Sequence, residues 1–312
     1  MKKNKEILSL LNEKQLFEYK LNSITYGSIE IREVSKKRYI YVHYREEGIR
    51  FTKYVGEYSD DLYNLIINNN IVAKDLKKQI RFFKKSLKGL DYQKVELNSK
   101  IELNIDFAKR HLADIIYEQA ILEGISTTYA DTKNILEGGK VNNMTPVDVM
   151  KIVNLKHAWE FIINKNVICS VSNVSLLCEI NKLIEEGFYY NAGKIRTIPV
   201  TIGGTLWKPP LPIESIIEEE LANILNSRVS IVDKAIEILL YLMKRQIFID
   251  GNKRTAVIFA NHFLIAKGKG ILIIPAELIN EYKCLLIDYY EGKNIKKIKE
   301  FLKLQCYKNI DV

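Results

Sequence analysis

Cysteine is scarce in this chain, and the placement of its cysteines excludes several kinds of metal site. Cys169, Cys178, Cys284 and Cys306 form no C-x-x-C pair, and no group of Cys and His residues has the spacing of metal ligands. Isolated cysteines in apolar surroundings are typical of proteins kept in a reducing compartment. We therefore expect a cytoplasmic protein without a zinc-finger site.

Long apolar runs are also missing. No stretch reaches the roughly 18 residues of a transmembrane helix, so we expect no membrane association. The opening Met1–Glu6 leads into a mixed helix rather than the apolar segment of a signal peptide. Internal repeats and low-complexity tracts are absent as well. With 312 residues, 47% of them hydrophobic, the chain can bury a sizeable core, which excludes a fully disordered protein.

Positive charge is in excess, with a net charge of +9, and much of it lies in one segment. This basic segment contains Lys74, Lys77, Lys78, Arg81, Lys84, Lys85 and Lys88. It is typical of a solvated helix face, and a nucleic-acid-binding face is the alternative. No recognition helix or zinc-finger spacing supports the alternative elsewhere, so we expect nucleic acid to bind only here, if at all.

The first 95 residues predict a small accessory region made of a helix, a β-hairpin and a basic helix. Residues 4–20 have a helical pattern, whereas 39–44 and 50–55 alternate as strands around a turn at 46–48. Ser59 is a good cap for the helix that follows, with Asp60 and Asp61 in its first turn. Gly89 is a plausible end for that helix.

From about residue 100 the pattern becomes mostly helical. The predicted helices lie near 101–122, 145–165, 173–187, 213–225, 229–245, 252–267 and 275–288. The exception is 193–212, where 196–202 alternates and ends in Gly203-Gly204. We expect a short β-hairpin there, followed by an extended segment at Pro209, Pro210 and Pro212.

The segment Gln246–Ala256, Q-I-F-I-D-G-N-K-R-T-A, has the composition of an anion site. A helix that begins near Asn252 offers free N–H groups and a positive dipole end. Gly251 permits close approach by a phosphate, and Asp250 supplies an oxygen ligand for magnesium. Arg254 can bind phosphate oxygens with two N–H groups, while Lys253 adds a point charge. The alternative is an ordinary helix–loop–helix turn, anchored on the core by Phe248.

Three segments resemble those of the Fic/Fido family. The core motif of that family is H-x-F-x-[D/E]-[G/A]-N-[G/K]-R, and this sequence matches it at Phe248, Asp250, Gly251, Asn252, Lys253 and Arg254. Residues 193–212 are similar to the family's β-hairpin flap and the following G-T-x-x-x-P-P run. Glu123-Gly124 is similar to the inhibitory-helix signature [S/T]-x-x-x-E-[G/N] of the self-inhibited class. The resemblance covers roughly residues 100–300 and implies a mainly α-helical Fic/Fido domain over 96–312.

The resemblance also implies an activity. Family members bind ATP with Mg²⁺ and transfer AMP to a Ser, Thr or Tyr hydroxyl of a target protein. It implies a metal at Asp250, a nucleotide at Phe248, Gly251, Asn252, Lys253 and Arg254, and a catalytic position at 246 supported by Arg254. An extended target segment would pair with the flap, a form of β-augmentation. The flap comprises Lys194, Ile195, Arg196, Thr197, Ile198, Pro199, Val200 and Thr201.

Three positions depart from the family pattern. Gln246 replaces the histidine that acts as the base, and loss of a base typically costs about 10²–10⁴-fold in rate. Lys253 with Val257 is similar to the death-on-curing branch, which implies a toxin that transfers phosphate from a reversed nucleotide. Val257 also replaces the arginine that the inhibitory glutamate normally meets, and Gln119 takes the Ser/Thr position of that signature. Glu123 would then have to pair with Arg254 or Lys253, unless Glu123-Gly124 simply ends a helix.

Three hypotheses therefore stay open: a weakened AMP-transferring enzyme, an inactive nucleotide-binding scaffold, and a death-on-curing-like protein kinase toxin. The sequence also leaves self-association open.

Overall fold

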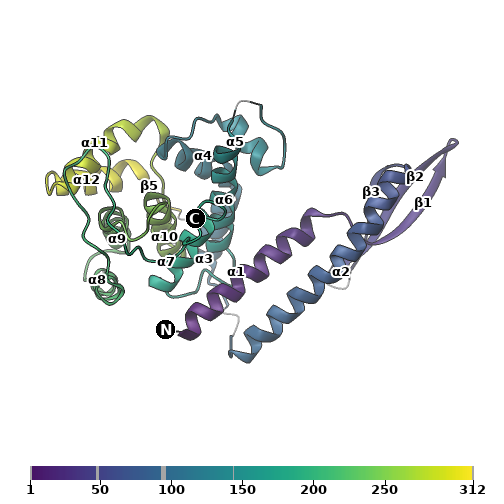
Figure 1. Ribbon diagram of the computed structural model, residues 1–312, viewed down its shortest axis with the longest axis horizontal. Helices are drawn as coiled ribbons and strands as arrows, with labels where there is room; N and C mark the ends of the chain where they lie inside the picture. The colour runs from purple at the N-terminus through teal and green to yellow at the C-terminus, as the bar shows by residue number, and fades with distance from the viewer. Residues whose placement is uncertain (1, 47–48, 93–95, 143, 311–312) are drawn as a thin grey trace. The chain divides into compact units, whose positions relative to one another are not determined.

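The computed structural model describes residues 2–46, 49–92, 96–142 and 144–310. Its contacts divide the chain into two compact units (Figure 1). One comprises Lys2 with residues 9–93, and the other comprises Met1 and residues 3–8 with 94–312. Most described residues are helical and the two sheets are small, which confirms the expectation of a mainly α-helical fold. Within the described ranges, no helix is both long enough and apolar enough to cross a membrane.

The N-terminal unit contains a three-stranded antiparallel sheet rather than the expected hairpin. It contains Lys2 and residues 9–23 of α1 (Lys2–Ser23), together with β1 (Ser28–Val34), β2 (Lys37–Glu46), β3 (Ile49–Glu57) and α2 (Asp60–Gly89). Strand β1 was not predicted from the sequence, because it is an edge strand that is mostly exposed and carries only a weak apolar pattern. The β1–β2 turn places Ser35 and Lys36 at φ 52° and 64°, although the sequence lacks the Asn-Gly signal of such turns. Of the expected β2–β3 turn, Glu47 and Gly48 lie outside the described residues.

One face of α2 packs against both the sheet and α1. Ile66 joins Ile40 and Val42 of β2 in one buried cluster. Ala73, Leu76 and Ile80 form a second cluster with Leu21 of α1. The expected cap is confirmed, because the Ser59 side chain accepts a hydrogen bond from Leu62 N, and α2 ends at Gly89 as expected. The buried stripe on α2 leaves its lysines on the remaining faces.

Helices make up almost all of the C-terminal unit. They are α3 (Ser99–Arg110), α4 (Leu112–Leu122), α5 (Tyr129–Leu136), α6 (Pro146–Ile162), α7 (Val174–Ile184), α8 (Glu214–Asn226), α9 (Ile231–Arg245), α10 (Asn252–Ala266), α11 (Ile279–Tyr290) and α12 (Ile295–Phe301). The short elements are β4 (Ile271–Leu272), η1 (Ala276–Leu278), η2 (Leu302–Cys306) and β5 (Tyr307–Lys308), and β4 pairs with β5. Helix α10 is buried on nearly all sides and packs against α6, α7 and α9. The segment singled out in the sequence therefore opens the central helix of this unit.

The structure corrects several predicted elements of this unit. The predicted helix 101–122 is two helices, α3 and α4, separated at His111. Helices α5 and α12 are additional. Described throughout, residues 193–212 contain no strand, so the expected hairpin is an extended loop instead. The buried side chain of Arg196 binds this loop, as shown below.

Candidate functional site

The loop between α9 and α10, residues 246–251, is called the anion loop below, and two of its residues lie in the left-handed region of backbone conformation. Gln246 ends α9 with φ 48° and ψ 67°, and Gly251 precedes α10 with φ 73°. A Cβ atom on Gly251 would lie 2.4 Å from Oε1 of Glu185, so any larger residue would have to displace that carboxylate as well as adopt a strained backbone. The Gln246 side chain donates from Nε2 to the Met243 carbonyl at 2.6 Å. An amide in this role can orient a hydroxyl but cannot take its proton at neutral pH.

The side chain of Asn252 forms two hydrogen bonds with the backbone of the loop. Its Oδ1 accepts a hydrogen bond from Phe248 N at 2.9 Å, and its Nδ2 donates to Phe248 O at 2.8 Å. The Phe248 side chain is buried in the core. Asn252 was expected to contact phosphates, but both polar atoms of its side chain bind the loop backbone. Its side chain therefore shapes the anion loop.

Arg254 lies buried at the centre of the site and faces three carboxylates. Its Nε is 3.4 Å from Glu123 Oε2, and its Nη2 is 2.8 Å from Glu185 Oε1 and 3.8 Å from Asp250 Oδ1. The contact expected between Glu123 and Arg254 is therefore present. These are ion pairs without hydrogen-bond alignment: among the described residues, Arg254 Nε and Nη1 and one oxygen each of Glu123 and Glu185 have no hydrogen-bond partner. A buried guanidinium with unused N–H groups is suited to an anion with several oxygens.

A buried hydrogen-bond chain places Glu123 beside Arg254. Gln119 donates from Nε2 to the Arg254 carbonyl at 3.0 Å and accepts at Oε1 from Trp159 Nε1 at 2.8 Å. Gln119 is 3% exposed, so both bonds form away from water. Glu123 follows one turn later, where α4 ends. Gly124 adopts φ 77°, and the Ile125 N–H bonds back to Ala120 O.

Val257 occupies the position at which the resemblance leads one to expect a second arginine. It is buried and lines a small cavity together with Gln119, Leu122 and Trp159. Its side chain is thus part of the contact between α4 and α10. An apolar residue there supplies packing and no charge, which leaves Arg254 as the cation that meets Glu123.

Glu185 belongs to the site although sequence reasoning missed it. It caps the C-terminal end of α7, and its side chain is 3% exposed. Burial, with repulsion from Asp250 and Glu123, raises the pKa of Glu185 to about 7. Its neutral and ionised forms therefore coexist near physiological pH. In the sequence it looks like one of the ordinary polar residues that end α7.

Asn181 is a second residue without a sequence signal, and it joins α7 to the anion loop and to the flap. Its Nδ2 donates to Asp250 O at 3.0 Å and to Thr255 Oγ1 at 3.1 Å. Its Oδ1 accepts from Gly193 N at 3.0 Å. Asn181 is buried, so the three bonds form a rigid junction.

Arg196 anchors the flap and differs in role from its neighbours. It was expected among the docking residues, but its side chain is 2% exposed. Its guanidinium donates to the carbonyls of Gln246 at 2.6 Å, Ile198 at 2.8 Å and Pro210 at 2.7 Å. These bonds replace the expected strand pairing within the flap and tie it to the anion loop. Lys194, Thr197, Ile198, Pro199 and Thr201 are exposed, while Ile195 and Val200 are half-buried.

The residues at this site suit a magnesium-bound polyphosphate. No group of three His, Cys, Asp or Glu side chains with metal-holding geometry occurs within the described ranges. Magnesium bound to phosphates needs only one or two protein carboxylates, and Asp250 is half exposed beside Arg254. Lys253 is partly exposed in the first turn of α10.

The nearest histidine in sequence cannot serve as the missing base. His262 is fully buried, with Nδ1 3.1 Å from Ser172 Oγ. Burial lowers the pKa of His262 to about 4, so its ring is neutral. His262 lies on α10, buried in the core of the C-terminal unit and about three helical turns from the anion loop.

Comparison with known proteins finds similarity to Fic proteins in both sequence and fold. Residues 171–264 match the model of the Fic/DOC family. The structure is similar to residues 134–508 of Fic-1 from C. elegans, with a TM-score of 0.52, 16% identity, and 78% of this chain and 77% of that chain covered. It is also similar to a Fic domain containing signaling protein from Bacteroides thetaiotaomicron, with a TM-score of 0.52, 20% identity, and coverage of 65% and 84%.

A Fic family protein from Desulfovibrio desulfuricans matches with a TM-score of 0.50, 16% identity, and coverage of 68% and 74%. No curated protein matches the chain. At identities this low, the structural similarity establishes a shared fold and no more. The family match is independent of it and covers the flap, α9 and most of α10. Residues 171–264 therefore match the Fic/DOC family, within a fold that is shared with Fic proteins.

Proposed function

We propose that this chain binds ATP with Mg²⁺ at Arg254 and transfers AMP to a hydroxyl side chain of a target protein. The observation that carries the proposal is the buried guanidinium of Arg254, which is faced by three carboxylates and has unused N–H groups. Carboxylate oxygens stand where phosphate oxygens would bind. Family membership supports a Fic-type transferase, and the choice of AMP is the finer proposal.

In the transfer, the target hydroxyl oxygen forms a bond to the α-phosphorus while the bond from that phosphorus to the leaving pyrophosphate breaks, and the hydroxyl proton passes to solvent water. Magnesium neutralises phosphate charge when bound. Arg254 holds phosphate oxygens, and Asn252 and Asn181 keep the loop in shape. Gln246 supplies no proton acceptor, so we expect slow transfer that depends on positioning alone.

A second activity, phosphate transfer of the death-on-curing type, is favoured by one observation. Val257 is buried against α4, so the position of the second arginine cannot touch a nucleotide, and Lys253 supplies the cation instead. This arrangement suits a nucleotide bound in the reversed orientation. An inactive scaffold is the remaining alternative, because Gln246 removes the base.

Labelled ATP separates these activities. The Gln246→His/Glu123→Gly variant is incubated with Mg²⁺ and either α- or γ-labelled ATP, alone and with a cell lysate, and labelled protein is counted. Label from the α-form, lost on adding Arg254→Ala, is the expected result. Label only from the γ-form would establish phosphate transfer instead, and no label from either form would leave only the scaffold.

A further inference from the structure

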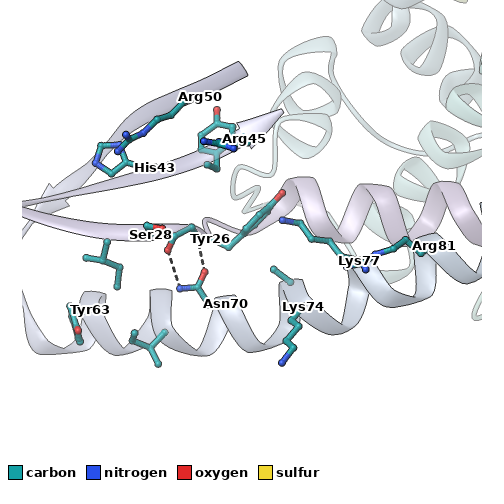
Figure 2. Close-up of a pocket in the computed structure, with 15 residues that line it drawn as sticks. Tyr26, Ser28, His43, Arg45, Arg50, Tyr63, Asn70, Lys74, Lys77 and Arg81 are labelled. Atoms are coloured by element: carbon teal, nitrogen blue, oxygen red, sulfur yellow. Dashed lines mark hydrogen bonds between the residues drawn. The ribbon is translucent and has the colours of Figure 1, made fainter. Parts of the chain in front are cut away.

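The N-terminal unit contains two adjoining cavities, the first between its sheet and α2 and the second lined by α1 as well. Figure 2 shows the first of them. Their volumes are about 900 Å³ and about 750 Å³. Both are lined by Tyr26, Tyr44, Arg45, Lys77 and Arg81, so we describe them together as the basic groove. Every residue that lines the groove belongs to this one unit.

The groove is strongly cationic. Lys74, Lys77, Arg81 and Lys84 line it from α2. Arg45, Arg50 and Lys53 line it from β2 and β3. Among the described residues that line the groove, Glu18 of α1 is the one carboxylate. Within the described part of the chain, none of these seven cations forms an ion pair. Unpaired positive charge around a concave surface favours a polyanionic ligand.

The spacing of the α2 cations fits a regular polyanion. Lys74, Lys77, Arg81 and Lys84 recur every three or four residues and therefore share one face of the helix. They span about 15 Å at 1.5 Å per residue. This length matches roughly four nucleotides at a rise of 3.4 Å per nucleotide.

Tyrosines line the groove beside these cations. Tyr26, Tyr44 and Tyr63 are each half-buried and contribute to the wall of the larger cavity. The Lys77 ammonium lies 4.4 Å from the centre of the Tyr26 ring. A positive groove with aromatic side chains is the arrangement by which proteins hold single-stranded nucleic acid, with phosphates on the cations and bases on the rings.

The segment that carries Tyr26 is fixed in place. Gly27 exchanges two hydrogen bonds with the side chain of Asn70, at 2.7 Å and 3.0 Å, drawn as dashed lines in Figure 2. Asn69 donates to Thr25 O at 3.0 Å. Gly27 has φ 143°, and a Cβ there would lie 2.3 Å from His43 O. The wall of the groove is therefore held by its own contacts before any ligand binds.

We propose that the basic groove binds single-stranded nucleic acid. Its volume admits a few nucleobases, whereas both backbones of a duplex would have to stay at its rim. The function is separate from nucleotide transfer and does not depend on it. The contacts are to phosphates and base faces, so we expect little preference for sequence.

The test measures binding of the full chain to a fluorescent 12-nucleotide single strand of mixed sequence. Affinity should fall steeply with salt, with a slope near −3 for about four phosphate contacts. The Lys77→Glu/Arg81→Glu variant should bind at least about tenfold more weakly. The matched control, Lys78→Glu/Lys85→Glu, makes the same charge change at exposed positions of α2 outside the groove and should stay within about twofold.

A neutral variant, Lys77→Gln/Arg81→Gln, with helix content checked by circular dichroism, keeps the test valid if the charge reversal unfolds α2. The proposal is overturned if the strand is not bound at low salt, or if the control pair weakens binding as much as the groove pair. Tighter binding of a duplex of equal length, or binding only to vesicles that contain anionic lipid, would equally overturn it.

Discussion

Glu123 Oε2 lies 3.4 Å from Arg254 Nε, so the residue that caps the C-terminal end of α4 meets an arginine in the first turn of α10. The sequence has a valine where a second arginine would receive this glutamate. The glutamate instead reaches the arginine proposed to bind phosphate. Under the proposed function, the chain's own carboxylate would therefore compete directly with the nucleotide for one guanidinium.

Gln119→Ala should loosen α4 from α10. The substitution leaves the Arg254 carbonyl and the Trp159 indole N–H buried without their partners, which costs about 1–3 kcal/mol for each group. Urea denaturation should show a clear loss of unfolding free energy, whereas Gln305→Ala at an exposed position should change it little. Equal effects of the two substitutions would mean that this chain of bonds does not hold α4.

Glu185→Gln should alter how stability depends on pH. Because burial raises the pKa of Glu185 to about 7 from 4.5, the folded state holds this proton more tightly than the unfolded state does. The stabilisation is complete below pH 4.5 and is lost as pH rises through 7, with a slope of up to about 1.4 kcal/mol per pH unit.

The glutamine variant lacks this slope, so wild type and variant should diverge most between pH 4.5 and 7 in thermal unfolding. Glu137→Gln, at an exposed carboxylate, should leave the slope unchanged. Parallel profiles for wild type and Glu185→Gln would show that Glu185 titrates normally.

Gly251→Ala should be more damaging than Gly138→Ala. The two glycines have similar φ values, 73° and 80°, so alanine meets about 1–2 kcal/mol of backbone strain at either. At position 251 the new Cβ atom would also collide with Glu185, because it would lie 2.4 Å from Oε1. At position 138 no other heavy atom lies within 4 Å of the new Cβ. Chemical denaturation should show the larger loss at 251, and equal losses would mean that Glu185 moves aside without cost.

The sequence predicted the parts of the site that depend on local patterns. Helices α9 and α10 follow from a clear apolar stripe and from the Asp250-Gly251 turn between them. The prediction of a hairpin in the flap was wrong because its alternating pattern includes Arg196, whose buried side chain binds four backbone carbonyls in place of a strand ladder. Glu185 and Asn181 were missed because they meet the anion loop only through packing of α7 on α10. Nothing near either residue in the sequence signals that contact.

Calorimetry of ATP binding in the presence of Mg²⁺ tests the central claim most directly, with wild type, Glu123→Gly and Glu123→Gly/Arg254→Ala compared. Removing the competing carboxylate should tighten binding by about tenfold, equivalent to about 1.4 kcal/mol. Adding Arg254→Ala should abolish that binding. Equal affinity of wild type and Glu123→Gly, or full binding without Arg254, would contradict the account.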